Sequence, residues 1–561
     1  MNGQIKILIV GGYGTFGGRL VELIEDEPRL TLIVAGRSLE KAKAFATARG
    51  VVKARLVPAA FDRNGDVDAQ LATLRPDIVV DASGPFQAYG EGRYEVVEAC
   101  IAQGIHYFDL ADGSDFVAGI GTFDGPARAA DVAVLSGVSS FPVLTAAVVR
   151  ILSAGMRRID SIRGGIAPSP FAGVGENVIR AIASYAGRSV AIRRDGTFSR
   201  GHPFTESMRY TIAPPGLVPL KSTLFSLVDV PDLRALGDLW PDAKEIWMGA
   251  GPVPEILHRA LIGLAWLVRL RVVPTLTPLA RLMSFTSNRL SWGEHRGGMF
   301  IEVEGMAADG AVLKRSWHLL AEGDDGPLIP SMAVAAIIGR VLNGVAPVAG
   351  ARAATRDVEL DDYEALFAGR TIKSGTREPI QNSAPLYERV LGAAWHKLPG
   401  AIRSMHDVKT GLFAEGRADI DRGKGIFAHP IAWIMGFPKA GREIPLTVQF
   451  KAADGVETWT RDFDGQRFSS RQFEGAGRSK FLLRERFGPL CFAMALVADE
   501  ERLRLVLRRW SFLGVPLPMW LCPRSDSYET VQDGRFRFHV EISLIWVGLL
   551  IRYRGWLVPR S

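Results

Sequence analysis

The chain has 561 residues, of which 47% are hydrophobic and 23% are charged, and its formal net charge is +7. This balance excludes long disordered regions, and the length corresponds to about three or four domains. The three cysteines have no short metal or redox spacing, which excludes a disulfide scaffold and favours a reducing compartment.

The N-terminus runs directly into an apolar strand, so no secretory signal is expected. The most membrane-like stretch, Ile256–Met283, is interrupted by four arginines and two prolines. Its longest uncharged core, Ala260–Val268, has nine residues, whereas a spanning helix needs about 20. Two interpretations stay open: a helix buried in the core or against another subunit, or a helix on a membrane surface with its arginines reaching water. We expect a cytoplasmic protein, with peripheral contact to the inner face of a membrane as an open alternative.

Apolar strand patterns alternate with helix patterns along the first 125 residues. Strands are predicted at residues 5–10, 30–35 and 78–82, and helices at 19–25 and 39–49. Apolar strands separated by amphipathic helices are typical of a parallel sheet covered on both faces. We therefore assign residues 1–137 to a doubly wound α/β domain of the Rossmann type.

A second domain, of mixed α/β structure, is predicted over residues 138–365. Glycine and proline become more frequent here, and residues 299–303 and 312–320 form two strand patterns around an Asp309-Gly310 turn. Aspartate followed by glycine between two strands is a good hairpin signal. The strand order of this domain does not follow from the sequence.

A β-rich C-terminal domain is predicted over residues 384–559, after a predicted linker at residues 373–376. Near the end of the chain apolar and polar residues alternate, and the apolar face holds Phe536, Phe538, Val540, Ile542 and Leu544. This alternation is typical of antiparallel strands with one buried face. Such a face either packs on a helix and closes a core or curves around a hydrophobic ligand, and both interpretations stay open.

The segment Gly11-Gly12-Tyr13-Gly14-Thr15-Phe16-Gly17-Gly18 follows the first predicted strand and opens the first helix. Glycines with this spacing and in this context predict a dinucleotide-binding turn. Gly12 would permit the tight turn, Gly14 the approach of the pyrophosphate, and Gly17 the close packing of helix and strand. The backbone N–H groups of Thr15 and Phe16 would then meet the phosphate charge. The alternative is a glycine-rich turn that holds no ligand.

The second predicted strand ends in Ala-Gly-Arg-Ser at residues 35–38. Sites that prefer NAD carry an acidic residue about 20 positions after the glycines, but this chain has Arg37 there, followed by Ser38. A guanidinium and a hydroxyl suit a 2′-phosphate. We therefore predict NADP rather than NAD, the alternative being that Arg37 lies in solvent without a ligand.

Two further segments follow predicted strands, and ligands of doubly wound sheets bind outside the carboxyl ends of strands. The strand at 78–82 is followed by four residues that we expect near the nicotinamide ribose and ring: Ser83, Gly84, Pro85 and Phe86. Asp62 follows the stretch 56–61 and could contact the edge of the adenine.

These segments resemble the saccharopine dehydrogenase-like, NAD(P)-binding oxidoreductases over roughly residues 1–365. The residues that carry the resemblance lie at 11–18, 35–38, 83–90, 107–113 and 326–330. The resemblance implies a Rossmann domain, a catalytic domain with a mixed sheet, and hydride transfer with a nicotinamide cofactor. Some relatives look like trans-acting enoyl reductases of lipid synthesis, and others like amino-acid pathway enzymes. The tail, residues 384–559, resembles a domain family of unknown function and implies no chemistry.

Hydride transfer needs one proton donor or acceptor besides the cofactor. Tyr89, His106, Asp109 and Asp112 lie on segments expected near strand ends, and we name Asp112 and Tyr89 as catalytic candidates. For Asp112 a structural, hydrogen-bonded role is the alternative. Three histidines of the second domain are expected in the core or on the surface: His202, His295 and His318. No histidine–carboxylate spacing indicates a metal.

Three hypotheses of function follow. The first is an NADP-dependent oxidoreductase that acts on a small or lipid-like substrate, the second a non-catalytic NADP-binding redox sensor, and the third a lipid-binding module of a membrane surface. A homodimer is an open alternative, and no nucleic-acid partner is expected, because no recognition motif accompanies the basic residues.

The basic excess lies in the last third of the chain, where residues 377–561 hold 28 Lys and Arg against 20 Asp and Glu. The densest basic group consists of Arg502, Arg504, Arg508 and Arg509. Because basic residues near an anionic lipid surface each contribute roughly 1 kcal/mol, this group predicts a salt-sensitive association with anionic vesicles.

Overall fold

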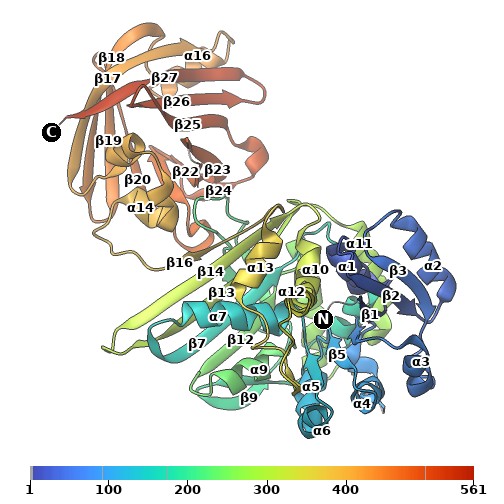
Figure 1. Ribbon diagram of the computed structural model, residues 1–561. Helices are drawn as coiled ribbons and strands as arrows, with labels where there is room; N and C mark the ends of the chain where they lie inside the picture. Colours follow the sequence, from blue (N-terminus) through green and yellow to red (C-terminus); the bar gives the residue numbers. More distant parts are fainter. Residues whose placement is uncertain (1–3, 91, 174, 500, 561) are drawn as a thin grey trace. The chain divides into compact units, whose positions relative to one another are not determined.

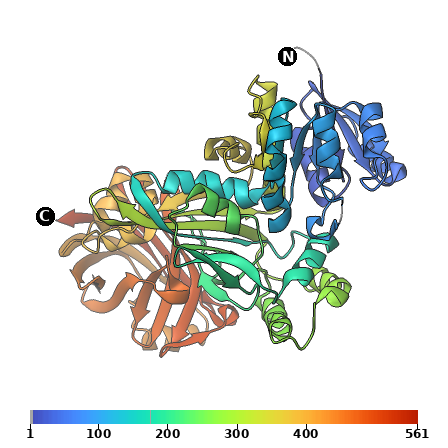
Figure 2. The same ribbon diagram turned by 90° about the horizontal axis from the view of Figure 1, so that it is seen from below.

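The computed structural model describes residues 4–90, 92–173, 175–499 and 501–560 (Figures 1 and 2). The chain folds into two compact units. Unit 1 contains Met1–Met208 and Thr223–Lys373, and unit 2 contains Arg209–Ser222 and Ser374–Ser561.

Unit 1 begins with a parallel sheet of strand order β15-β6-β5-β4-β1-β2-β3. The strands are β1 (Ile5–Val10), β2 (Leu30–Gly36), β3 (Arg55–Ala60), β4 (Ile78–Asp81), β5 (His106–Asp109), β6 (Ala133–Ser136) and β15 (Gly350–Ala353). Every residue of β2 is buried, as expected of a strand with helices on both faces. The predicted Rossmann fold is therefore confirmed. The strand order reverses between β1 and β4, and this is where doubly wound sheets bind ligands.

Helices cover both faces of this sheet (Figure 2). They include α1 (Thr15–Ile24), α2 (Leu39–Ala48), α3 (Val67–Leu74) and α4 (Glu95–Ala102). Helix α1 begins at Thr15, four residues before the predicted start at residue 19, so the glycine segment leads into it without a gap.

The second sheet of unit 1 is mixed, with the order β10-β11-β12-β7-β13-β14-β16 and with β8 and β9 as a side branch on β12. Its strands are β7 (Met156–Ala167), β8 (Val190–Arg194), β9 (Thr197–Gly201), β10 (Ser207–Tyr210), β11 (Thr223–Leu227), β12 (Glu245–Ala250), β13 (Arg296–Ala307), β14 (Val312–Glu322) and β16 (Ile372–Arg377). The predicted hairpin is confirmed, because β13 and β14 pair antiparallel around Asp309 and Gly310.

Two features of these sheets differ from the sequence analysis. Residues 373–376, predicted to be a linker, belong to strand β16, which pairs with β14; a polar composition does not exclude an edge strand whose outer side chains face water. Residues 350–353, placed in the second domain, form β15 beside β6 in the first sheet. The domain limits 1–137, 138–365 and 384–559 otherwise stay predictions.

The stretch Ile256–Met283 forms α10 (Glu255–Arg269) and the start of α11 (Ala280–Arg289). The buried residues of α10 are His258, Ala265 and Val268, so burial of the whole helix in the core was wrong. Large apolar side chains point outward instead, among them Leu270 and Phe285, each 64% exposed. The alternatives in which this exposed apolar surface contacts another subunit or a membrane stay open.

None of the described helices has the length and apolarity needed to cross a membrane.

Unit 2 is dominated by an antiparallel sheet in which β22 pairs with β23 and β17 pairs with β27, so that the sheet closes into a barrel (Figure 1, orange to red). The strands are β17 (Gly411–Arg422), β18 (Gly441–Ala453), β19 (Val456–Phe463), β20 (Gln466–Glu474), β21 (Leu483–Phe487), β22 (Leu490–Ala498), β23 (Arg502–Phe512), β24 (Val515–Leu517), β25 (Arg524–Gln532), β26 (Arg535–Leu544) and β27 (Gly548–Arg560). The helices of this unit are α14 (Leu386–Leu391), α15 (Gly400–His406) and α16 (Ala428–Ile434). The predicted β-rich domain is confirmed.

Candidate active site

The glycine segment forms a tight turn between β1 and α1. Gly11, rather than Gly12, has the left-handed backbone conformation, with φ +77°. A Cβ on Gly12 would lie 2.9 Å from the carbonyl oxygen of Ile9, so Gly12 is required for close packing and not for its backbone angles. The tight turn therefore depends on both glycines, on Gly11 for its backbone conformation and on Gly12 for its close packing.

Gly14 and Gly17 have the two environments that the motif predicts. A Cβ on Gly17 would lie 2.3 Å from the carbonyl oxygen of Gly11, which no side chain can occupy. A Cβ on Gly14 would meet the same oxygen at 3.0 Å and otherwise faces open space. Gly14 and Thr15 are exposed at the start of α1, where the backbone N–H groups of the first turn have no acceptor within the helix. This end of α1 can receive a phosphate.

Arg37 follows β2 and is exposed, and it forms no ion pair with any described residue. Ser38 is the N-cap of α2, where its hydroxyl accepts a hydrogen bond from the N–H of Lys41 at 3.3 Å. The N–H of Ser38 donates to the hydroxyl of Tyr13 at 3.1 Å, which ties the end of β2 to the glycine turn. A cationic side chain beside a helix N-terminus forms a suitable anion site.

Ser83, Gly84, Pro85 and Phe86 follow β4, next to the glycine turn. The Ser83 hydroxyl donates to Asp81 at 2.6 Å and lies 2.8 Å from the Tyr89 hydroxyl. The Phe86 side chain is buried and packs against Tyr89 and Phe116, with ring centroids 5.0 Å apart in both cases. The side chain of Phe86 therefore belongs to the core, and only its backbone could face a cofactor.

The sequence analysis missed Arg63. Its guanidinium carbon lies 3.2 Å from the centroid of the Tyr89 ring, and its Nη2 lies 3.9 Å from a carboxylate oxygen of the buried Asp81. Burial, together with the charge of Asp81, raises the pKa of Tyr89 far above its usual value. Tyr89 thus lies in a network with Ser83, Arg63 and Asp81, and its catalytic role stays a prediction.

Asp62 lies just beyond β3, the outermost strand of the sheet on this side, and its carboxylate is exposed. The carboxylate accepts a hydrogen bond from the N–H of Asn64 at 3.1 Å. Its contact with an adenine stays a prediction.

The segment before α8 (Glu176–Tyr185) lies against the start of α1. A Cβ on Gly175 would lie 3.2 Å from the hydroxyl oxygen of Thr15, and the Asn177 amide donates to the carbonyl of Gly84 at 3.2 Å. This connection of the second sheet, between β7 and α8, thus contacts both the start of α1 after the glycine turn and the segment that follows β4. Sequence spacing gave no signal for Asn177, which is 93 residues from Gly84.

Asp112 lies in the loop after β5, in a group of titratable side chains that also includes Tyr185 of α8 and Asp229 of the loop after β11. Its carboxylate accepts a hydrogen bond from the Gln87 amide at 3.1 Å. Burial raises the pKa of Asp112, and the charge of Asp229 adds to the increase. Burial also raises the pKa of Tyr185 well above its usual value, with the charges of Asp229 and Asp112 as further causes.

Asp229 and Tyr185 were missed because they come from the second domain. Asp229 accepts a hydrogen bond from Ser114 at 2.5 Å, and burial raises the pKa of its carboxyl. These half-buried groups form a polar site that can hold or move a proton beside the strand ends.

The other candidates do not join this site. His106 begins β5 at the amino end of the sheet, where its Nδ1 accepts a hydrogen bond from the N–H of Ala133 at 3.0 Å. Asp109 is fully buried and accepts hydrogen bonds from Ala111, Ser136 and Gly137, which is a structural role. His318 is buried, whereas His295 is exposed beside Asp324. Within the described ranges no three His, Cys, Asp or Glu side chains gather as metal ligands do.

Two family models match the chain. Residues 7–124 match the saccharopine dehydrogenase NADP binding domain, and residues 398–557 match a domain of unknown function, DUF4166. No curated protein sequence matches the chain.

Several solved structures are similar to this chain at low identity. Apo saccharopine dehydrogenase (L-Glu forming) from Saccharomyces cerevisiae is 16% identical with a TM-score of 0.46, and the match covers 66% of this chain and 99% of that one. GenD2 from gentamicin A biosynthesis, in complex with NAD, is 13% identical with a TM-score of 0.33, covering 68% and 98% of the two chains. Biliverdin reductase from Synechocystis sp. PCC 6803, in complex with biliverdin and NADP+, is 13% identical with a TM-score of 0.29, covering 65% and 96%.

The fold, the glycine turn and the family model together define an oxidoreductase that binds a nicotinamide dinucleotide. Its first domain belongs to the saccharopine dehydrogenase NADP binding domains, and its C-terminal barrel belongs to DUF4166.

Proposed function

We propose that this oxidoreductase prefers NADP and transfers hydride to or from an apolar, lipid-like substrate. The observation that carries the cofactor preference is Arg37, which stands exposed at the carboxyl end of β2 without an ion pair to another described residue. A carboxylate at this place would repel a 2′-phosphate, whereas a guanidinium can donate two parallel hydrogen bonds to it.

The chain's own residues can supply the remaining chemistry. The nicotinamide, when bound, provides or accepts the hydride. Asp112 can then hold a proton near the strand ends, because its raised pKa favours the protonated carboxyl. Gln87 positions Asp112 through the hydrogen bond between their side chains, and Tyr89 positions Ser83.

The lipid-like substrate is supported by an apolar surface next to α8. We call it the α10–α11 patch; its members are Ile256, Trp266, Leu267, Leu270, Val272, Leu279, Leu282 and Phe285, all of which are exposed. Helix α11 packs on α8, whose first turn carries Asn177 and whose last residue is Tyr185. An exposed apolar patch of this kind marks a site of interaction with an apolar ligand, a membrane or another protein. The patch also supports peripheral contact with a membrane, from which such a substrate would come.

Steady-state oxidation of NADPH with a series of 2-alkenals of increasing chain length tests this proposal. If the chain of the substrate is bound on an apolar surface, kcat/KM should rise by about fourfold per methylene, from about 0.8 kcal/mol for each buried CH₂, until the surface is filled. A flat series would contradict an apolar substrate. NADPH binding without any turnover would favour the redox sensor, and failure to bind NADPH would favour the lipid-binding module.

A further inference from the structure

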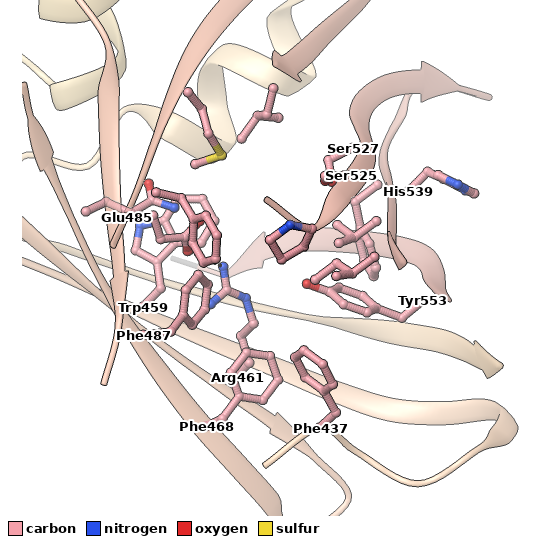
Figure 3. A pocket seen from close by; sticks show the side chains of 18 of the residues that line it. Phe437, Trp459, Arg461, Phe468, Glu485, Phe487, Ser525, Ser527, His539 and Tyr553 are labelled. Carbon is pink, nitrogen blue, oxygen red and sulfur yellow. Dashed lines mark hydrogen bonds and ion pairs between the residues drawn. The ribbon is translucent and has the colours of Figure 1, made fainter. Parts of the chain in front are cut away.

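The barrel of unit 2 encloses a cavity of about 300 Å³, which lies within the size range of small-molecule sites. Figure 3 shows side chains from several strands pointing into it, among them Phe468, Phe487 and Tyr553. Along β26 the side chains of Val540 and Ile542 also line the cavity, and both remain half-buried although they point into the barrel. Side chains in a filled core would be inaccessible to solvent, so this part of the barrel contains an unfilled cavity.

The two ends of the barrel differ. At one end α14 and α15 pack against the strands, and Leu391, Ile402 and Met405 are at most 1% exposed. This end has a buried core, and Tyr387 of α14 and Met405 of α15 also line the cavity. Toward the other end the lining includes Ile431 and Met435 from the α16 segment and Leu521. The alternating strands therefore pack on helices and also surround a cavity.

The cavity end carries exposed apolar side chains. The pairs Arg422–Ile551, Arg524–Ser543 and Leu490–Phe512 bring three connections to this end of the barrel. These connections carry Ile426 (87% exposed), Phe427 (68%), Trp433 (81%), Leu513 (73%), Trp520 (68%) and Trp546 (91%). An apolar rim around an apolar cavity provides an entrance for a hydrophobic molecule.

One wall of the cavity, formed by β19, β20 and β21, carries an ion pair. Polar side chains from β25 and β26 also line the cavity: Ser525, Ser527, Glu529 and His539. Arg461 lies 3.4 Å from Glu485 and donates to the Ser470 hydroxyl at 2.9 Å, and Figure 3 shows its side chain extending among the aromatic rings. The two charges compensate each other. Gln472, which pairs with Glu485 across the strands, is 1% exposed, and its Oε1 has no hydrogen-bond partner among the described residues.

We propose that this cavity binds an uncharged amphiphile that has a long apolar body and a single hydroxyl group. A hydroxyl can donate to Gln472 Oε1 and accept from the Arg461 guanidinium, so it satisfies both groups at once. A carboxylate could not donate and would be repelled by Glu485, whereas an ammonium group would be repelled by Arg461. This site goes beyond the oxidoreductase function and does not depend on it.

Calorimetric titration of the full chain with three ligands of equal length tests the head group: 1-decanol, decanoate and decylamine. We expect decanol to bind at least tenfold more tightly than either charged ligand. Equal or tighter binding of decanoate or decylamine would overturn the assignment of the head group, and absence of decanol binding would overturn the site.

Variants of the lining residues then test whether decanol binds in this cavity. Val540→Trp fills the cavity from β26 and should weaken decanol binding at least tenfold, whereas the matched change Gln449→Trp, at an exposed position on the outer face of β18, should leave it within twofold. Gln472→Leu removes the free acceptor and should weaken binding roughly 2- to 10-fold, as expected for one neutral hydrogen bond. Unchanged affinity in Val540→Trp would overturn the proposal. NADPH binding and the unfolding midpoint report whether each variant is folded, and if Val540→Trp unfolds, Leu507→Trp on β23 replaces it.

Discussion

Arg37 is the residue on which the cofactor preference depends. Arg37→Asp should weaken NADPH binding by roughly 10- to 100-fold, because a charge-assisted hydrogen bond contributes about 1.5–3 kcal/mol, and should leave NADH nearly unchanged. Fluorescence titration with both nucleotides measures the two affinities. The control is Lys53→Asp, which makes the same charge change at an exposed residue before the amino end of β3, whereas Arg37 follows the carboxyl end of the neighbouring strand β2. Equal losses for NADPH and NADH would refute the role of Arg37.

Two glycines of the turn should respond differently to substitution. Gly14→Val places a side chain where the cofactor approaches, so it should abolish NADPH binding and change stability little. Gly17→Ala places its Cβ against the Gly11 carbonyl and should lower the free energy of unfolding by about 1–3 kcal/mol, as overpacking does. Urea unfolding and nucleotide titration of both variants separate the effects. Retained binding in Gly14→Val would show that the turn is only structural.

Asp109 should make stability depend on pH. Burial raises its pKa in the folded chain to about 7, above the usual value of about 4 in an unfolded chain. The neutral carboxyl therefore stabilises the folded chain fully at low pH. This contribution is lost as the pH rises from about 4 through 7. The free energy of unfolding should therefore fall by up to about 1.4 kcal/mol per pH unit over this window. Asp109→Asn retains an acceptor for the Ala111, Ser136 and Gly137 donors and should remove this slope. The prediction fails if chemical unfolding between pH 5 and 8 gives the same slope for both proteins.

The sequence analysis identified the site residues that directly follow strands, but it missed those that come from distant segments of the chain. The glycine turn, Arg37 and Ser83 come directly after β1, β2 and β4, so spacing and the doubly wound topology predict that they lie together. Asp229 and Tyr185 come from segments more than 70 residues further along the chain than Asp112. Their meeting depends on tertiary packing that no local pattern encodes.

At the scale of elements, the α10–α11 patch should govern contact with apolar partners. Leu282→Glu, at a side chain 59% exposed on α11, should lower kcat/KM for long-chain substrates and reduce co-sedimentation with lipid vesicles, while NADPH binding stays unchanged. The control Asn288→Glu adds the same charge at an exposed polar position of the same helix. If Leu282→Glu instead only dissociates a dimer in size-exclusion chromatography, the patch is an interface between two copies of this chain.

Elements were predictable where their periodicity was strong and not where tertiary pairing decided the structure. The buried strands of the first sheet and the alternating face of β26 follow from the spacing of apolar residues. Strand β16 was mistaken for a linker, because its side chains are polar and its pairing with β14 leaves no trace in the sequence. The basic group on β23 also has a partner that the sequence hides, since Arg508 donates to the carbonyl of Pro219 at 3.0 Å.

At the scale of the whole molecule, the chain joins an oxidoreductase unit to a barrel with its own cavity. Both units present apolar features to a ligand: the α10–α11 patch in unit 1 and the rimmed cavity in unit 2.

Transfer of deuterium from NADPH labelled at the nicotinamide C4 position tests the central claim most directly. The full chain is incubated with the labelled cofactor and a total cell extract, and the apolar and water-soluble fractions are analysed by mass spectrometry, with Gly14→Val as the control that cannot bind cofactor. The account predicts deuterium in an apolar product, dependent on the wild-type glycine turn and greater with NADPH than with NADH. Label found only in water-soluble products, or equally with the Gly14→Val protein, would contradict it.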